Sequence, residues 1–110
     1  MAIGATELPE MLPVEGVRLA TVCAGMKKPN RRDVVLIEMA EGVRCAGAFT
    51  RNAFCAAPVL LAKQHILQTA PRYLLINTGN ANAGTGDIGY QDAKQSCEQL
   101  AKEMQSSAEQ

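Results

Sequence analysis

The fold is decided by the stretch RYLLINTGNANAGTGDIGYQDAKQSCEQLAKEM, residues 72–104. Its first part, 72–77, is an apolar run that predicts a β-strand, and a strand apolar on both faces needs cover on each side. Its last part predicts an amphipathic helix with Asp87 as N-cap, because apolar residues recur at helical spacing. That stripe consists of Tyr90, Ala93, Cys97, Leu100, Ala101 and Met104. A loop rich in glycine and asparagine, 78–86, joins the two.

Upstream of this unit the sequence predicts three more strand candidates. Residues 18–23 can be extended, and 34–39 (VVLIEM) is rich in β-branched residues, which favours a buried strand. A Glu-Gly turn at 41–42 separates that run from 43–49 (VRCAGAF), so the two predict a β-hairpin. The apolar run 56–62 (AAPVLLA) fits either a strand or a helix, and a helical turn is predicted directly after it.

Four strand candidates and one strong helix predict an α/β fold of the α+β type. One helix covers only part of such a sheet, so we expect this sequence to be part of a larger architecture. Residues 1–16 contain Pro9, Pro13 and Gly16 and are predicted to form an irregular leader. Residues 17–110 are predicted to belong to a single domain.

Composition narrows the functional class. The chain has 110 residues, 47% of them hydrophobic, and its 11 Lys+Arg balance 11 Asp+Glu. A nucleic-acid binder normally carries excess positive charge, so this balance argues against that class. No apolar run reaches the length of a membrane span, and the first residues resemble no targeting signal. We therefore expect a soluble, cytoplasmic protein.

The cluster KKPNRR at 27–32 could bind phosphate, but a solvated loop is the favoured interpretation.

The cysteines and the single histidine predict no metal centre. Cys23, Cys45, Cys55 and Cys97 form no C-x-x-C pair, and His65 cannot complete a zinc set of familiar spacing. The first three lie among small or apolar neighbours, where cysteine packs as a small hydrophobe. Reduced, buried thiols without disulfides are expected.

The glycine-rich loop contains the spacing G-x-G-x-x-G, formed by Gly84, Gly86 and Gly89. Dinucleotide binding is disfavoured, because six residues separate the preceding strand from the first of these glycines and that fingerprint needs an immediate turn. Two interpretations of the loop remain open. Its backbone N–H groups could hold an anion or a carbonyl oxygen, or Asn80 and Asn82 could satisfy backbone groups within a tight, self-bonded crossover.

No catalytic constellation is visible from residue types alone. The sequence has no G-x-S-x-G nucleophile elbow and no paired carboxylates at a useful spacing. An N-terminal threonine can act as nucleophile with its own amine as base, but neither Thr6 nor Thr21 lies in a convincing cleavage context.

Three stretches closely resemble the ornithine acetyltransferase family, also called glutamate N-acetyltransferase, which serves arginine biosynthesis. They are PVEGVRLATVCAGMKKPNRRDVVLIEMAEG (13–42), AGAFTRNAFCAAPV (46–59) and LLINTGNANAGTG (74–86). The resemblance implies a multifunctional acyltransferase that moves acetyl from N-acetylornithine, and in some members from acetyl-CoA, to glutamate. It further implies a sandwich of sheets flanked by helices, autocatalytic cleavage before an internal threonine that then carries the acetyl group, and a heterotetramer without metal or organic cofactor.

The resemblance assigns no catalytic residue to this chain. The family's oxyanion and nucleophile motifs do not occur here, and Thr78-Gly79 belongs to the N-T-G-N-A-N string and not to the oxyanion pair. The chain thus resembles the front part of the amino-terminal subunit, expected to be inactive without the rest of its precursor. The alternative is a non-catalytic binding or regulatory module that shares the fold. Residues expected to line or brace the substrate pocket are Asn77, Thr78, Gly79, Asn80 and Asn82.

Overall fold

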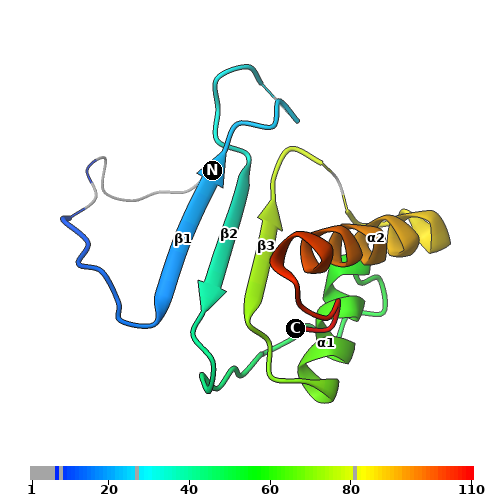
Figure 1. Ribbon diagram of the computed structural model, residues 1–110. Helices are drawn as coiled ribbons and strands as arrows, with labels where there is room; N and C mark the ends of the chain where they lie inside the picture. The colour runs from blue at the N-terminus through cyan, green and yellow to red at the C-terminus, as the bar shows by residue number, and fades with distance from the viewer. Residues whose placement is uncertain (1–6, 8, 27, 81) are drawn as a thin grey trace.

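The computed structural model describes residues 7, 9–26, 28–80 and 82–110. The elements follow one another as β1 (Val17–Val22), β2 (Val34–Met39), α1 (Ala57–Gln68), β3 (Tyr73–Asn77) and α2 (Gly86–Met104). The three strands form one antiparallel sheet in the order β1-β2-β3 (Figure 1). The α+β class is therefore confirmed, and the described residues contribute a single sheet to it.

The strand register sorts the side chains onto two faces, because residues opposite each other in a sheet share a face. Leu19 lies opposite Ile37 and Ile37 opposite Leu74, whereas Leu36 lies opposite Leu75 on the other face. We call the first the apolar face; it comprises Val17, Leu19, Thr21, Val35, Ile37, Met39, Leu74 and Ile76. The second, the mixed face, carries charged Arg18 and Glu38 among its apolar residues.

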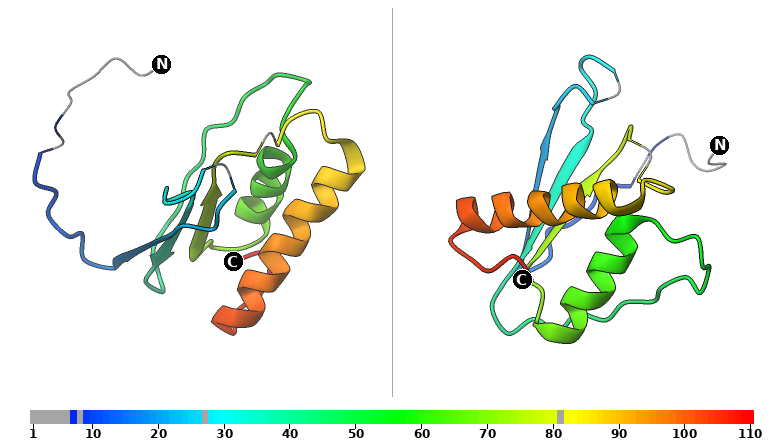
Figure 2. Two further views of the ribbon diagram at one scale, coloured as in Figure 1. Left: turned by 90° about the horizontal axis from the view of Figure 1, so that it is seen from above. Right: turned by 90° about the vertical axis from the view of Figure 1, so that its right-hand side faces the viewer.

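The two helices pack against each other on the β3 side of the sheet, away from β1 (Figure 2). The Tyr90 hydroxyl on α2 lies 2.5 Å from the Gln64 side-chain oxygen on α1 and donates a hydrogen bond to it. Among the described residues the buried apolar side chains are those of Ala57, Leu61 and Ala101, all on these helices. The core of the chain is accordingly small and lies between the helices.

The structure decides the open alternative at the first helix and corrects the expected start of the second. The run that fitted either strand or helix is α1, and Pro58 stands in its first turn, where the missing N–H is not needed. The predicted N-cap of α2, Asp87, is wrong: the helix begins at Gly86 after Thr85, and Asp87 lies within the first turn. There its carboxylate still faces the positive end of the helix dipole.

The predicted hairpin between 34–39 and 43–49 is wrong. Residues 43–49 form no strand, because β1 and β3 occupy both edges of β2. The segment instead runs beside α1, where the side chain of Lys63 donates to the Thr50 carbonyl at 3.2 Å and lies over the Phe49 ring.

The chain exposes more surface than a compact protein of its mass, and large apolar side chains are part of it. Its accessible surface is 9031 Å², whereas a compact protein of this mass exposes about 5,900 Å². On the apolar face of the sheet, Leu19 is 69% exposed, and Leu74 and Ile76 are 48% and 44% exposed. The expectation that β3 needs cover on both faces is therefore not met within the described residues.

The cysteines are free thiols, as expected, but Cys23 is exposed and the prediction that it is buried is wrong. Cys45, Cys55 and Cys97 are half-buried.

The part of the predicted leader that is described, 7 and 9–16, forms no helix or strand; residues 1–6 and 8, Thr6 among them, lie outside the described residues. Within the described chain, no helix combines the length and apolarity needed to cross a membrane.

Candidate functional site

The structure brings together the three asparagines of the candidate loop. Asn82 donates through its side-chain nitrogen to the Asn77 side-chain oxygen at 3.0 Å, and Asn80 donates in the same way to Asn82 at 3.2 Å. Asn77 and Asn80 are exposed and Asn82 is half-buried. The loop is therefore self-bonded, but through hydrogen bonds between asparagine side chains and not through the bonds to backbone groups that the crossover interpretation expected.

Two backbone hydrogen bonds anchor the loop at its ends. The Thr78 N–H donates to the Asp33 carbonyl at 2.9 Å, and the Asn82 carbonyl accepts from the Ala57 N–H at 3.3 Å, at the start of α1. Gly79 has φ +88°, a conformation that favours glycine. Thr78 and Gly79 are exposed between these anchors. Of the five predicted site residues, Asn77 is the last residue of β3 and the other four lie in the loop that follows it, which leads to α2 and is hydrogen-bonded to the start of α1.

Asp33 is the residue that the sequence analysis missed. It is 3% exposed, and its carboxylate accepts hydrogen bonds of 2.6 Å from the backbone N–H groups of Ala24 and Met26. Its own N–H donates to the Val22 carbonyl at 3.1 Å. Asp33 therefore closes the turn after β1 and, through Thr78, joins that turn to the asparagine loop. The sequence did offer a signal for it: Asp33 is an acidic residue placed directly between the cationic loop (27–32) and the strand at 34–39.

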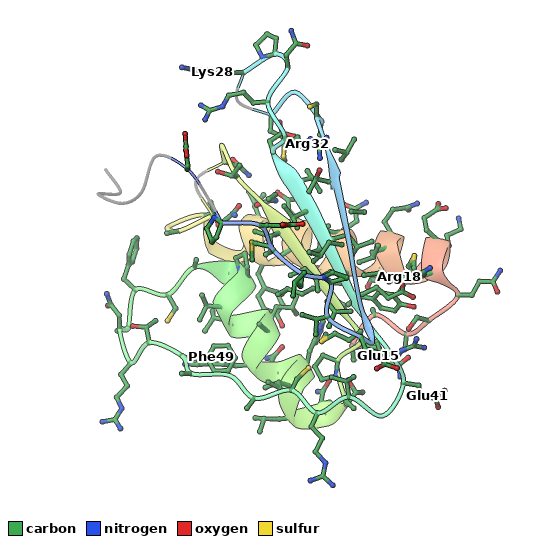
Figure 3. The ribbon with its side chains drawn as sticks, turned by 90° about the vertical axis from the view of Figure 1, so that its left-hand side faces the viewer. Glu15, Arg18, Lys28, Arg32, Glu41 and Phe49 are labelled. Carbon is green, nitrogen blue, oxygen red and sulfur yellow. The ribbon has the colours of Figure 1, made fainter. Side chains whose placement is uncertain are left out.

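The cationic loop between β1 and β2 extends beyond this end of the sheet (Figure 3). Lys28, Arg31 and Arg32 are exposed, and the Arg32 guanidinium donates to the Thr21 hydroxyl at 2.5 Å. The remaining cation, Lys27, lies outside the described residues. Exposure of these side chains agrees with the solvated-loop interpretation.

The glycines of the G-x-G-x-x-G spacing do not form an open phosphate cradle. A Cβ atom at Gly84 would lie 2.8 Å from the Phe54 ring, so that ring already covers the glycine. Gly89 lies inside α2 and packs against the side chain of Thr85. Gly84 and Gly86 have φ +70° and +60°, and their freedom is used to turn the chain into α2.

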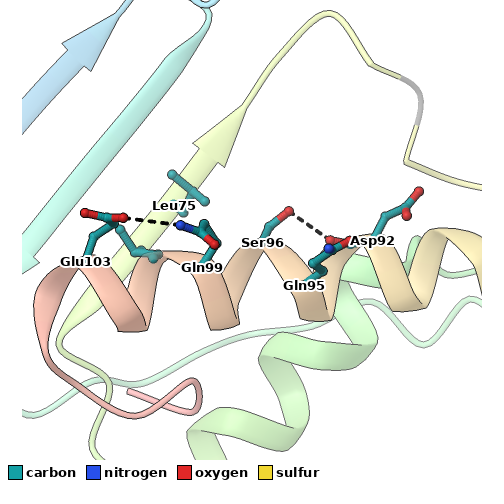
Figure 4. Close-up of a pocket in the computed structure, with 7 residues that line it drawn as sticks. Leu75, Asp92, Gln95, Ser96, Gln99 and Glu103 are labelled. Atoms are coloured by element: carbon teal, nitrogen blue, oxygen red, sulfur yellow. Dashed lines mark hydrogen bonds between the residues drawn. The ribbon is translucent and has the colours of Figure 1, made fainter.

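A shallow groove of about 570 Å³ lies between β3 and α2 (Figure 4). The Ser96 hydroxyl in it donates to the Asp92 carbonyl at 2.8 Å, and Gln99 donates to Glu103 at 3.2 Å. The Ser96 hydroxyl proton is thus held by a backbone carbonyl and not by a side chain that could act as a base. Across the described ranges, no group of three His, Cys, Asp or Glu side chains is placed to hold a metal ion. The groove is lined by Leu75, Asp92, Gln95, Ser96, Gln99, Leu100 and Glu103.

A sequence model of the ArgJ family matches residues 18–110. The chain belongs to the ArgJ family. It is 58% identical over 91 residues to the arginine biosynthesis bifunctional protein ArgJ of Methylococcus capsulatus, covering 83% of this chain and 22% of that protein. It is 56% identical over 102 residues to the ArgJ protein of Pseudomonas syringae pv. tomato, covering 93% and 25%. The chain thus spans about a quarter of the length of these ArgJ relatives.

Solved structures show the same fold. The ornithine acetyltransferase of Mycobacterium tuberculosis, solved in complex with ornithine, has a TM-score of 0.79 and 33% identity, over 86% of this chain and 52% of that one. The ArgJ protein of Bacillus halodurans has a TM-score of 0.80 and 25% identity, over 86% and 50%. The fold and the family predicted from the sequence are therefore confirmed.

Proposed function

We propose that this chain forms part of an ArgJ acetyltransferase that moves an acetyl group from N-acetylornithine to glutamate in arginine biosynthesis, with acetyl-CoA as a further donor. The observation that carries the proposal is the family match over residues 18–110, at 58% identity to one ArgJ protein. The relative solved with ornithine supports an ornithine-type substrate for the same fold. Such biosynthetic chemistry belongs in the cytoplasm and needs no organic cofactor or metal.

The acetyl-accepting group is proposed to come from polypeptide outside this chain. A threonine released by autocatalytic cleavage can attack the acetyl carbonyl of N-acetylornithine, so that the C–N bond breaks, ornithine leaves as the free amine and an acetyl ester forms; the amine of glutamate then takes the acetyl group and the threonine hydroxyl is restored. Three threonine hydroxyls of the described chain already form hydrogen bonds: Thr21 accepts from Arg32, Thr50 accepts from the Asn52 N–H at 3.1 Å, and Thr69 donates to the Glu109 carbonyl at 2.7 Å. In the assembled enzyme, proposed to be a heterotetramer of two long and two short chains, this chain would position and enclose the substrate.

The asparagine loop is the part of this chain proposed to line or brace the substrate pocket. Asn77, Asn80 and Asn82 hold one another, so their remaining amide donors and acceptors keep fixed directions. Amides at fixed directions recognise carboxylate and acetamide groups without carrying charge into the pocket. The anchor from Asn82 to the start of α1 holds the loop against the helix pair.

A chimaera tests the function. Residues 9–110 replace the matched segment of the P. syringae relative, and the hybrid gene is introduced into an arginine-requiring strain that lacks this acetyltransferase. We expect growth without arginine, together with ornithine released from N-acetylornithine only when glutamate is present. A stable, soluble hybrid that supports neither growth nor transfer would instead favour the non-catalytic module.

A further inference from the structure

The positive charge of this chain is concentrated in the cationic loop. Four of its 11 Lys+Arg residues lie in KKPNRR (27–32), so the rest of the sequence holds seven cations against 11 Asp+Glu. Lys28 and Arg32 lie beyond one end of the sheet, whereas the exposed acids Glu15 and Glu41 lie at the other end (Figure 3). A chain without net charge therefore carries a local positive potential at one end of its sheet.

The cations of this loop are not neutralised by neighbouring acids. Lys28, Arg31 and Arg32 are exposed. The ion pairs between described residues are Arg18 with Glu38 and Lys94 with Glu98, so none of the three loop cations belongs to one. Solvent surrounds their charged groups, and the same exposure lets an anionic ligand reach them.

The base of the loop is held in place. The Asp33 carboxylate accepts hydrogen bonds of 2.6 Å from the N–H groups of Ala24 and Met26, which close the turn after β1. The Arg32 guanidinium donates to the Thr21 hydroxyl, so this cation is oriented by the strand beside it. A loop ordered in this way before binding loses less conformational entropy when it takes a ligand.

The cationic loop lies beside the asparagine loop. Val34 at the start of β2 pairs with Asn77 at the end of β3, and the Thr78 N–H donates to the Asp33 carbonyl at 2.9 Å. Both loops consequently leave the same end of the sheet (Figure 1). A ligand that reaches from one loop to the other needs anionic groups at one end and a group for the substrate pocket at the other.

We propose that Lys28, Arg31 and Arg32 bind the phosphate groups of coenzyme A when acetyl-CoA is the acetyl donor. The inference rests on the proposed function and gives one of its two donors a binding site. CoA carries a diphosphate and a further phosphate at its nucleotide end, and the acetyl thioester at the end of a flexible arm. Lysine and arginine form charge-assisted hydrogen bonds with phosphate oxygens, and the arm can then place the thioester at the asparagine loop. N-acetylornithine has no phosphate, so the cationic loop serves one donor and not the other.

Calorimetric titration of the chimaera with CoA tests the site without requiring catalysis. The double variant Lys28→Ala/Arg31→Ala removes two cations, and the matched control Arg44→Ala/Lys102→Ala removes two exposed cations elsewhere. We expect the Kd for CoA to rise at least about tenfold in the loop variant and to stay unchanged in the control. Pantetheine, which has the thiol arm without phosphates, should bind all three proteins equally. Equal CoA affinity in the wild type and the loop variant, or equal weakening by the control, would overturn the proposal.

Kinetics separate this inference from the proposed function. In the loop variant, KM for acetyl-CoA should rise at least about tenfold, with KM for N-acetylornithine and for glutamate at the wild-type value. An equal rise for either amino-acid substrate would assign the cations to a substrate carboxylate and overturn the proposal. A chimaera that binds CoA through the loop and transfers no acetyl group contradicts the proposed function alone. One that transfers acetyl from N-acetylornithine, but binds CoA equally with and without Lys28 and Arg31, contradicts this inference alone.

Discussion

Replacing Asp33 with alanine should destabilise the end of the sheet that carries the candidate loop. The wild-type carboxylate is buried and accepts two backbone hydrogen bonds of 2.6 Å, from Ala24 and Met26. Alanine leaves both N–H groups without this acceptor, so the turn after β1 loses the two hydrogen bonds that close it. Because Thr78 is bonded to the Asp33 backbone carbonyl, loosening that turn also loosens the asparagine loop.

The magnitude follows from the two bonds. A hydrogen bond to a charged group contributes about 1.5–3 kcal/mol net, so the loss of two, partly relieved by water, should cost about 3 kcal/mol. Asp33→Asn keeps one acceptor oxygen and turns an NH₂ group toward the second donor, so we expect about half of that cost. Asp87→Ala, an exposed acid in the first turn of α2, should cost less than about 1 kcal/mol.

Urea unfolding of the chimaera, followed by a probe in the sheet, measures these differences as shifts of the midpoint at constant slope. The expected order of stability is wild type, Asp87→Ala, Asp33→Asn, Asp33→Ala. If Asp33→Ala lies within 0.5 kcal/mol of Asp87→Ala, a difference typical of surface substitutions, the role given to Asp33 is refuted.

Three further predictions follow from other contacts. Gly84→Ala places a Cβ 2.8 Å from the Phe54 ring at φ +70° and should cost about 1–2 kcal/mol in thermal unfolding, part of it recovered by adding Phe54→Ala; no loss for the single variant would contradict the contact. Asn82→Ala removes both side-chain hydrogen bonds of the loop and should lower kcat/KM for acetyl transfer about tenfold, or 1.4 kcal/mol. The control Gln91→Ala, at an exposed position of α2, should leave kcat/KM unchanged, and equal values for the two variants would contradict a role of the loop in the pocket. Burial, and then the Glu98 carboxylate, raise the pKa of the Cys97 thiol, so mass spectrometry at mildly alkaline pH should find Cys97 alkylated more slowly than exposed Cys23. Because folding raises the pKa of this thiol, its contribution to stability is complete below the unfolded pKa and is lost as the pH rises through the folded pKa. Alkylation of Cys97 before Cys23 would contradict the burial of Cys97.

Local patterns in the sequence were sufficient to predict most of the elements. The β-branched residues of β2 favour a strand, and the apolar residues of α2 recur at helical spacing, so each stretch predicts its own conformation. The error at 43–49 has a physical cause, since pairing is decided by which strands reach the edges of β2. Its second partner, β3, lies almost forty positions further along the chain, and no local pattern announces so distant a pairing.

The candidate site was predictable in place but not in detail. Glycine and asparagine marked the loop at 77–82, because these residues tolerate tight backbone turns. The hydrogen bonds from Asn80 to Asn82 and from Asn82 to Asn77 depend on how the loop folds back. The hydrogen bond that the Asp33 carboxylate accepts comes from Ala24, nine residues earlier in the chain. Such contacts arise from tertiary geometry, so composition and spacing could not have provided them.

The most direct test of the central claim compares acetyl transfer from N-acetylornithine to glutamate by the 110-residue chain alone and by the same residues within the chimaera. If the chain contributes positioning groups to a site whose nucleophile comes from elsewhere in an ArgJ polypeptide, the chimaera forms N-acetylglutamate and the isolated chain forms none. Turnover by the isolated chain would contradict the account.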